Sequence, residues 1–243
     1  MKVLVKPRWA PVAHWTTADA PLDGAVFDPP VTGTVYGVIL NVRSQVEALG
    51  EALSAPPYGK PPVAPVLYIK PPNTYAGDGA VLAVPAGTEA LEVNATLAVV
   101  IGETACRVAD SHALDHVLGY AVAIDACIPH ANLHRPAIRQ RCRDGFLPIG
   151  PWVTARDEVA DPDALTVTVA VNGQEKIRWS TAELVRPVAR LIADISDFMT
   201  LFEGDVLLVG LPPNGPQARV GDRVEAQIAG VGKLTCTLAE DAA

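Results

Sequence analysis

The sequence predicts an α+β fold, in which a curled mixed β-sheet is accompanied by about three helices. Many short runs rich in Val, Leu and Ile alternate with turn residues, and only about three segments have helical spacing. The 22 prolines and 19 glycines are spread along all 243 residues, which is typical of a turn-rich β protein. We therefore expect one main domain, residues 34–243, preceded by an extension or small subdomain, residues 1–33.

The first third of this main domain is predicted to contain two strands and one helix. Residues 35–42 (VYGVILNV) are a continuous apolar run that suits a buried strand. The next residues, 44–53, have helical spacing, and Ser44 is a candidate N-cap. Residues 66–70 (VLYIK) form a short strand between two Pro- and Gly-rich segments, which we expect to be loops.

Two further buried strands and a helix are expected in the middle of the chain. Residues 91–102 (LEVNATLAVVIG) and 121–128 (AVAIDACI) are rich in apolar residues and have no helical period. Between them, residues 109–120 (ADSHALDHVLGY) predict a helix that begins at Asp110 or Ser111.

Two hairpins are predicted in the last third of the chain. Residues 166–179 alternate around a central Asn172-Gly173, which is a strong signal for a two-residue hairpin turn. Residues 223–238 form a second pair of strands, with the turn at residues 230–232. Both pairs add antiparallel strands to the predicted sheet.

A long helix is expected between the two hairpins. Its pattern runs from Thr181 towards Phe202, with Pro187 in the first turns or at a kink. Residues 205–210 (DVLLVG) follow as another buried strand.

Composition excludes several classes of function. A net charge of -8 and a pI near 5.1 argue against a general nucleic-acid binder. The four cysteines are widely spaced, without a CxxC or zinc pattern, and are expected to be reduced thiols. The amino terminus lacks the pattern of a signal peptide, and no uncharged apolar run is long enough to cross a bilayer. We expect a cytoplasmic protein with no nucleic-acid or membrane partner.

Eight motifs occur in the order found in the fumarylacetoacetate hydrolase family, which the chain resembles over roughly residues 34–240. They are GVILNV, YIKPPNT, VVIG, LGYAVAID, RCRDGFLPIGPW, VNG, FMTLFEGDVLLVG and AGVGKL. The resemblance implies the mixed β-sheet roll of that family.

Three segments, NVRSQVEA, HRPAIRQRCRDGFLPIG and WSTAEL, are similar to a branch of the family in which two such domains are fused in tandem. The chain resembles the amino-terminal domain of that pair. This resemblance implies a decarboxylase or isomerase of 4-hydroxyphenylacetate (homoprotocatechuate) degradation. Its substrate would be a small polycarboxylate, 5-oxopent-3-ene-1,2,5-tricarboxylate or 2-hydroxyhepta-2,4-dienedioate.

The family's metal ligands are mostly replaced in this sequence. Family members hold Mg²⁺ or Mn²⁺ through a Glu-x-Glu pair and an aspartate on the next strand. Here the two glutamate positions are Asn94 and Thr96, which share one face of a strand, whereas Asp125 retains the third position. A hard cation normally needs at least one or two carboxylates, so we expect a weak or absent metal site. The alternative for Asp125 is a buried aspartate satisfied by backbone N–H groups, Arg135 or Arg141.

The sequence also offers three catalytic candidates, Arg141, Lys70 and Asp144. Arg141 stands where the family has a lysine, three residues before Asp144. Lys70, at a strand end, either faces the same pocket or is an ordinary exposed lysine. Arg135, Arg141 and Arg143 either bind substrate carboxylates in two-point fashion or form an ion-pair network that fixes the loop.

Two departures concern the predicted substrate site. Gln45 stands where a histidine is common in the family's lid segment, and we assign it, with Asn94, Thr96 and Arg135, to substrate binding. The usual Thr-Gly-Thr-Pro turn has become residues 209–212, VGLP, so both hydroxyls are absent.

Two functions from different classes follow from these residues. The chain is either an enzyme of the implied pathway or a non-catalytic subunit that lacks the metal site and pairs with a metal-competent paralogue. In both cases we expect a homodimer or a heteromer with such a paralogue, because the family generally associates through its sheet-rich domain.

Overall fold

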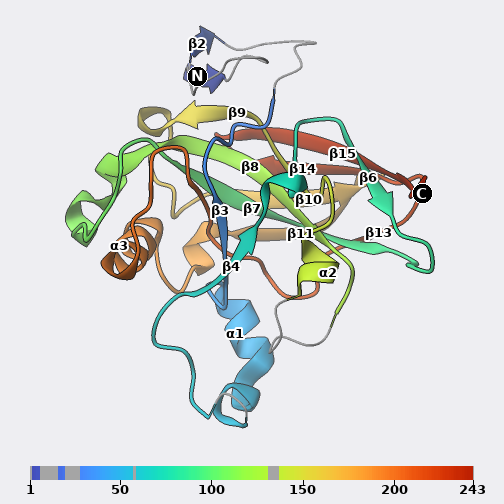
Figure 1. The fold of residues 1–243 in the computed structure, drawn as a ribbon, viewed down its shortest axis with the longest axis horizontal. Helices are drawn as coiled ribbons and strands as arrows, with labels where there is room; N and C mark the ends of the chain where they lie inside the picture. The colour runs from blue at the N-terminus through green and yellow to red at the C-terminus, as the bar shows by residue number, and fades with distance from the viewer. Residues whose placement is uncertain (1, 6–15, 20–27, 57–58, 131–136, 243) are drawn as a thin grey trace.

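The computed structural model describes residues 2–5, 16–19, 28–56, 59–130 and 137–242 as two β-sheets with helices at their margins (Figure 1). The ten-stranded sheet has the order β2-β1-β9-β8-β7-β12-β3-β4, with β13 paired to β7 and β5 paired to β9. Its strands are β1 Lys2–Val5, β2 Thr16–Asp19, β3 Val35–Ile39, β4 Val66–Lys70, β5 Tyr75–Ala76, β7 Leu91–Ile101, β8 Val117–Cys127, β9 Leu147–Ala155, β12 Val206–Leu208 and β13 Gln217–Ala218.

The five-stranded sheet has the order β11-β10-β14-β15-β6. Its strands are β6 Ala80–Val84, β10 Thr166–Val171, β11 Gln174–Ser180, β14 Arg223–Ile228 and β15 Gly232–Glu240. Only β15 and β6 are parallel in this sheet, and only β12–β3 and β5–β9 in the larger one. The mixed sheets confirm the predicted α+β class.

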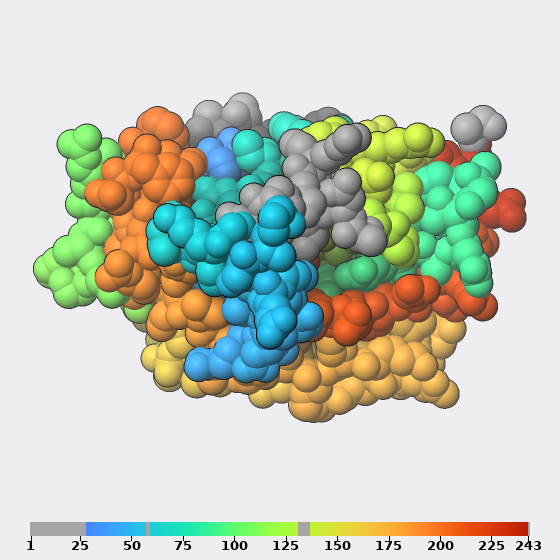
Figure 2. Space-filling model, turned by 90° about the horizontal axis from the view of Figure 1, so that it is seen from below, coloured from blue at the N-terminus to red at the C-terminus, as the bar shows by residue number. Residues whose placement is uncertain are grey.

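Helices form a minor part of the described chain. The α-helices are α1 Arg43–Leu49, α2 Ile138–Arg141 and α3 Val188–Phe198; the 3-10 helices are η1 Gly50–Ser54, η2 Pro72–Thr74, η3 Asp110–His116, η4 Arg156–Glu158 and η5 Thr181–Glu183. The blue segment of α1 and the residues after it project from the face shown in Figure 2. None of the helices in the described ranges is long and apolar enough to span a membrane.

Strand β7 is buried on both faces, which explains its nearly continuous apolar sequence. Its odd-numbered residues face the smaller sheet and form the main core with Val167 and Val169 of β10 and Val224 of β14. Its even-numbered residues point to the other face, where Ala98 and Val100 join a second apolar cluster. The polar residues of β7 therefore lie at one end of this second face.

The larger sheet curls into a roll. Strand β4 is four strands away from β8 in the sheet order, yet Lys70 of β4 bonds to Asp125 of β8. The short strand β5, which follows β4, pairs with β9 through Tyr75 and Leu147 and so brings the edge of the sheet back towards its middle. The predicted roll is confirmed, and its curvature positions the site described below.

Most predicted strands are confirmed. Strand β4 has the predicted bounds, and β7 lacks only the last predicted residue. The first hairpin turns at Asn172 and Gly173, with φ values of 51° and 76°, as a two-residue turn with left-handed residues requires. The second hairpin turns between Ile228 and Gly232, as expected.

The predicted helix over residues 109–120 is wrong in its second half. Residues Asp110–His116 form the 3-10 helix η3, but Val117 already begins β8 and pairs with Ile101 of β7. The apolar residues Val117 and Leu118 fit either pattern, and pairing with β7 decides between them. The strand that we expected to begin at Ala121 therefore begins four residues earlier.

The long helix predicted from Thr181 towards Phe202 is in fact two elements. A capping box between Ser180 and Glu183 begins the short helix η5, which ends at Glu183, and α3 begins only after Pro187. Proline disfavours helical backbone at the residue before it, so the two turns do not join. The helix near Ser44 begins at Arg43, with Val42 as the N-cap, so Ser44 does not cap it.

The described parts of residues 1–33 are attached to the main domain. Strand β1 pairs with β9 through Val3↔Thr154 and Leu4↔Val153, and β2 pairs with β1 at the sheet edge. Val31 is buried in the second apolar cluster. The amino-terminal segment thus contributes two strands to the larger sheet.

Candidate functional site

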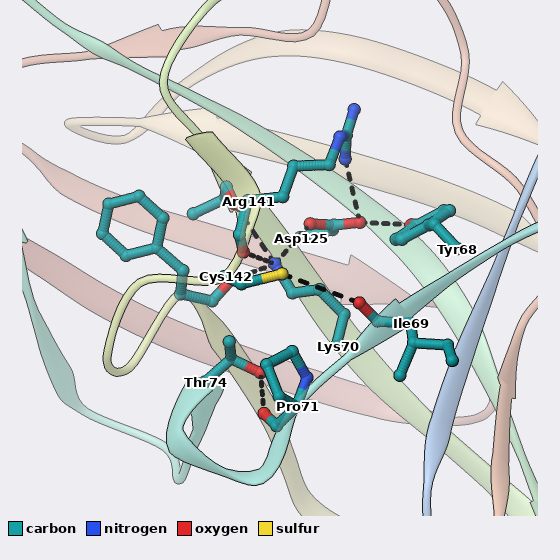
Figure 3. A network of polar contacts seen from close by, with 10 residues as sticks. Tyr68, Ile69, Lys70, Pro71, Thr74, Asp125, Arg141 and Cys142 are labelled. Atoms are coloured by element: carbon teal, nitrogen blue, oxygen red, sulfur yellow. Dashed lines mark hydrogen bonds and ion pairs between the residues drawn. The ribbon is translucent and has the colours of Figure 1, made fainter. Parts of the chain in front are cut away.

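A buried carboxylate, that of Asp125 on β8, is the centre of a polar cluster inside the roll (Figure 3). The Nζ atom of Lys70 lies 2.9 Å from its Oδ1 atom, and Nη1 of Arg141 lies 3.3 Å from Oδ2. The Tyr68 hydroxyl also donates a hydrogen bond to Oδ2. We call these four residues the Asp125 cluster.

The order of residues along β4 places two of the four members. Tyr68 and Lys70 are two residues apart, so both side chains leave the same face of the strand. The Tyr68 ring lies over Gly37 of β3, its partner in the ladder, where a Cβ atom would collide with the ring. The guanidinium of Arg141, at the end of α2, lies 5.2 Å from the centre of the same ring, a distance suited to a cation–π contact.

The ammonium of Lys70 is fully enclosed by oxygen atoms. Besides Asp125, it donates to the carbonyl oxygens of Arg141 at 2.7 Å, Phe146 at 3.1 Å and Ala126 at 3.4 Å. Its side chain has no exposed surface. The structure therefore excludes the alternative that Lys70 is an ordinary exposed lysine at a strand end. Lys70 instead forms an ion pair with Asp125.

The charges of the cluster stabilise one another. Burial alone would raise the pKa of Asp125, but Lys70 and Arg141 hold this pKa below its ordinary value. Burial likewise favours the neutral form of Arg141, yet the carboxylate of Asp125 raises the pKa of the guanidinium. Burial, followed by Asp125, raises the pKa of Tyr68. At neutral pH the cluster thus contains an ionised carboxylate, a guanidinium and a protonated phenol.

Asn94 lies directly opposite Asp125 in the ladder between β7 and β8, and Thr96 lies opposite Ala123, as the predicted adjacent strands require. Both side chains are buried. The Asn94 amide nitrogen donates to the Pro212 carbonyl at 2.9 Å, whereas its Oδ1 atom is buried and accepts no hydrogen bond from the described residues. The loop that contains Pro212 therefore covers the position of the first family glutamate.

The donor set around Asp125 is poor in carboxylates. Within the described ranges, no group of three or more His, Cys, Asp or Glu side chains is arranged to hold a metal ion. Both oxygens of Asp125 already accept hydrogen bonds, and Asn94 turns its nitrogen towards a carbonyl. The Thr96 hydroxyl makes only a long contact, 3.4 Å, to the carbonyl of Leu97.

The other predicted site residues lie outside the Asp125 cluster. The exposed side chain of Asp144 accepts a hydrogen bond from Asn73 at 2.7 Å. Gln45, on α1, accepts one from the Leu40 backbone at 2.6 Å. Arg135 lies outside the described residues. Of the three catalytic candidates, the structure thus brings together Lys70 and Arg141 but not Asp144.

Sequence reasoning missed two residues near this site. Tyr68 belongs to the Asp125 cluster, and its position two residues before Lys70 on a predicted strand was the available signal. Glu92, two residues before Asn94, is half-buried, and burial raises the pKa of its carboxyl group. The same period of two places Glu92 on the face of Asn94 and Thr96.

Replacing Tyr68 with phenylalanine is expected to lower the free energy of unfolding by about 1–2 kcal/mol, because Asp125 loses one hydrogen bond while the ring stays in place. Denaturant unfolding measures this change. Tyr36→Phe is the matched control, since the Tyr36 hydroxyl has no polar partner in the described part of the chain. Equal losses in the two variants would contradict the role of the Tyr68 hydroxyl.

Comparison with known proteins identifies the family. The fumarylacetoacetate (FAA) hydrolase C-terminal family matches residues 34–239. A 4-hydroxyphenylacetate degradation bifunctional isomerase/decarboxylase from Salmonella dublin is 41% identical over 202 residues, 83% of this chain and 46% of that protein. The chain spans about half the length of the curated relatives that it matches in this group.

Solved structures of similar fold include enzymes named as isomerases and hydrolases. A 5-carboxymethyl-2-hydroxymuconate delta-isomerase from Mycobacterium smegmatis superposes with a TM-score of 0.78 at 27% identity, covering 96% of this chain and 89% of that chain. A maleylpyruvate hydrolase from Sphingobium sp. SYK-6, in complex with manganese(II) and pyruvate, gives 0.73 at 26% identity, with coverages of 92% and 77%. The chain described here belongs to the fumarylacetoacetate hydrolase family.

Proposed function

We propose that this chain serves the decarboxylation or isomerisation of a small unsaturated oxo-polycarboxylate in 4-hydroxyphenylacetate degradation. The substrates are 5-oxopent-3-ene-1,2,5-tricarboxylate or 2-hydroxyhepta-2,4-dienedioate. The names of the relatives at about 40% identity support this class of reaction. The observation that carries the proposal is the placement of Arg141. Its guanidinium is paired with Asp125, and 17% of the Arg141 side chain remains exposed.

Arg141 is the residue of the cluster that is suited to contact substrate. Its guanidinium has five N–H donors, and one nitrogen is bonded to Asp125 at 3.3 Å. The remaining donors can bind a carboxylate in two-point fashion or stabilise the oxygen of an enolate as its charge develops. Lys70, Tyr68 and Asp125 act as positioning residues that hold this guanidinium in place.

The further assignments rest on the family resemblance. Asn94, Thr96, Gln45 and Arg135 are proposed to bind substrate, and Asp144 is proposed to take part in catalysis. Among these five, Asn94 is the direct cross-strand neighbour of Asp125. Asp144 lines a neighbouring cavity with Arg139 and Arg143.

We infer that the chain by itself holds Mg²⁺ or Mn²⁺ weakly or not at all. A divalent cation at Asp125 would compete with the ammonium of Lys70 and the guanidinium of Arg141 for the same two oxygens. The family positions of the other carboxylates carry an amide and a hydroxyl, which bring no negative charge. The residues present do not fit the family's cation, so no step of the proposed reaction is assigned to a metal.

A non-catalytic subunit is the second candidate function. The observation that favours it is the enclosure of the site: Asn94, Thr96 and Asp125 are at most 1% exposed. The chain would then pack against a metal-competent paralogue as a structural subunit, as two domains pair in a fused protein. We propose a homodimer or a heteromer with such a paralogue as the working assembly.

An assay of the purified chain distinguishes the two candidates. Both substrates are supplied with EDTA, with Mn²⁺, and with a metal-competent family member added. If the chain is an enzyme that acts alone, we expect turnover in the presence of EDTA. The rate should fall at least about 100-fold in Arg141→Gln, because the variant loses a charged group that donates hydrogen bonds in the transition state. Arg219→Gln is the control, because Arg219 is an exposed arginine paired with Glu89.

Turnover that requires the added family member, and that Arg141→Gln leaves unchanged, would reject the enzyme proposal in favour of the non-catalytic subunit. Turnover that requires Mn²⁺ in the chain alone would reject the metal-independent site.

A further inference from the structure

A second site lies beside α2, on the other side of the backbone that encloses Lys70. It is a cavity of about 410 Å³, which we call the α2 cavity, within the size range of small-molecule sites. Its lining residues are Ala83, Ile138, Arg139, Cys142, Arg143, Asp144, Phe146 and Asp241. Figure 2 shows the yellow-green segment of α2 beside the green segment that follows β6. We propose that the α2 cavity binds a small organic carboxylate through Arg139 and Arg143.

The two arginines provide donors that the protein leaves available. In the described part of the chain, the Arg139 side chain makes no hydrogen bond or ion pair. Arg143 uses one nitrogen, Nη2, in a 3.2 Å contact with Asp241. Both side chains of that pair are about one-third exposed, at 33% and 30%. Two guanidinium groups at one cavity, with most donors unused, are suited to a carboxylate ligand.

The two acidic residues of the cavity are not equivalent. The Asp144 carboxylate is already bonded to Asn73 at 2.7 Å. Asp241, which directly follows the last residue of β15, pairs with Arg143 at the surface. It is the anion that a ligand carboxylate would replace on Arg143.

An apolar surface favours an organic ligand over an inorganic anion. Ile138 is 61% exposed, and the half-buried Ala83 completes the accessible apolar part of the lining, whereas Phe146 is fully buried behind it. A short carbon chain can cover these groups, whereas phosphate cannot. The apolar contacts therefore add affinity for a carboxylate that carries carbon atoms.

The α2 cavity is separate from the Asp125 cluster, although the two share a wall. Cys142 and Phe146 line the cavity, whereas the carbonyl oxygens of Arg141 and Phe146 accept from Lys70 on the other side. The guanidinium of Arg141 points to Asp125 (Figure 3). Ligand binding at the cavity is consequently measurable without substrate turnover.

The test is a calorimetric titration of the full chain with succinate, with succinamide and inorganic phosphate as comparison ligands. We expect succinate to bind with an affinity that Arg141→Gln leaves unchanged, because Arg141 does not line the α2 cavity, and we expect the neutral succinamide not to bind. Arg139→Gln and Arg143→Gln should each weaken the binding of succinate at least about tenfold, because each removes a charged donor. Arg219→Gln is the matched control and should leave the binding unchanged.

Asp241→Asn provides the sharper variant, because it removes the competing carboxylate and should tighten the binding of succinate by about threefold. Circular dichroism of each variant checks that it is folded. Phosphate that binds as tightly as succinate, or unchanged affinity in folded Arg139→Gln, would overturn the proposal. So would weaker binding in Asp241→Asn. These outcomes do not depend on catalytic activity, so they leave the proposed function standing.

Discussion

Replacing Asp125 with asparagine is expected to lower the free energy of unfolding by about 3–5 kcal/mol. The variant leaves the buried ammonium of Lys70 and the largely buried guanidinium of Arg141 without a compensating charge. Burial of an unpaired charge costs far more than an intact pair contributes, so removing one partner has a large effect. Urea unfolding at neutral pH measures the change.

Two controls separate the charge from the substitution itself. Asp78→Asn changes an exposed aspartate that bonds to Thr235 without a cation, and it should cost less than about 1 kcal/mol. In the double variant Lys70→Met, Asp125→Asn, the two losses should be less than additive, because no buried ammonium remains unpaired. Additive losses would show that Lys70 and Asp125 are not coupled.

The same carboxylate predicts a pH dependence. Lys70 and Arg141 outweigh the effect of burial and hold the pKa of Asp125 below its ordinary value of 3.8. A lowered pKa in the folded state means that the folded state favours the ionised carboxylate more than the unfolded state does. This ionisation therefore stabilises the fold above pH 3.8, and the stabilisation is lost as the pH falls through the pKa of the folded state. The stability difference between the natural chain and Asp125→Asn should thus be constant from about pH 8 to 5 and decrease in acid.

Restoring both family glutamates is expected to have an equally large effect. In Asn94→Glu with Thr96→Glu, two carboxylates are added on β7, the strand that pairs with the Asp125 strand β8. Without a cation, this variant should lose several kcal/mol of stability, because buried like charges repel and the bond from Asn94 to Pro212 is lost. Mn²⁺ should bind at least about tenfold more tightly than it does to the natural chain, since the hard cation gains carboxylate ligands.

Thermal unfolding with and without Mn²⁺ links the two effects. A ligand that binds only the folded state raises the midpoint, so Mn²⁺ should restore the stability of the double variant and leave the natural chain nearly unchanged. Asn94→Gln with Thr96→Gln is the control, because it adds similar bulk without charge. A natural chain that binds Mn²⁺ as tightly as the double variant would contradict the inferred loss of the metal site.

Local sequence determined much of the architecture. The apolar run of β7 and the Asn172-Gly173 turn specify a strand and a hairpin almost independently of context, because burial and left-handed backbone leave few alternatives. Where the pattern was ambiguous, at Val117 and Leu118, pairing with β7 decided the outcome. Pro187 is visible in the sequence, but the pattern alone does not show that the chain forms two separate helices, η5 and α3, on either side of it.

For the site, the sequence determined which charges the chain carries and which family carboxylates it lacks. Asn94, Thr96 and Asp125 could be assigned to adjacent strands from their motifs and spacing, and their ladder position agrees. The loss of negative charge at two of the three positions follows from setting the sequence against the family pattern. It needed no coordinates.

Only the tertiary structure decided what Asp125 does with its charge. The curl of the sheet brings Tyr68 and Lys70 from β4 across to β8, between segments that are 55 residues or more apart in the chain. No local pattern encodes that approach, because it depends on the sum of strand twist and on the pairing of β5 with β9. Enclosure by three carbonyl oxygens then fixes the ammonium of Lys70 beside Asp125, so a buried ion pair stands where the family resemblance implied a metal ligand.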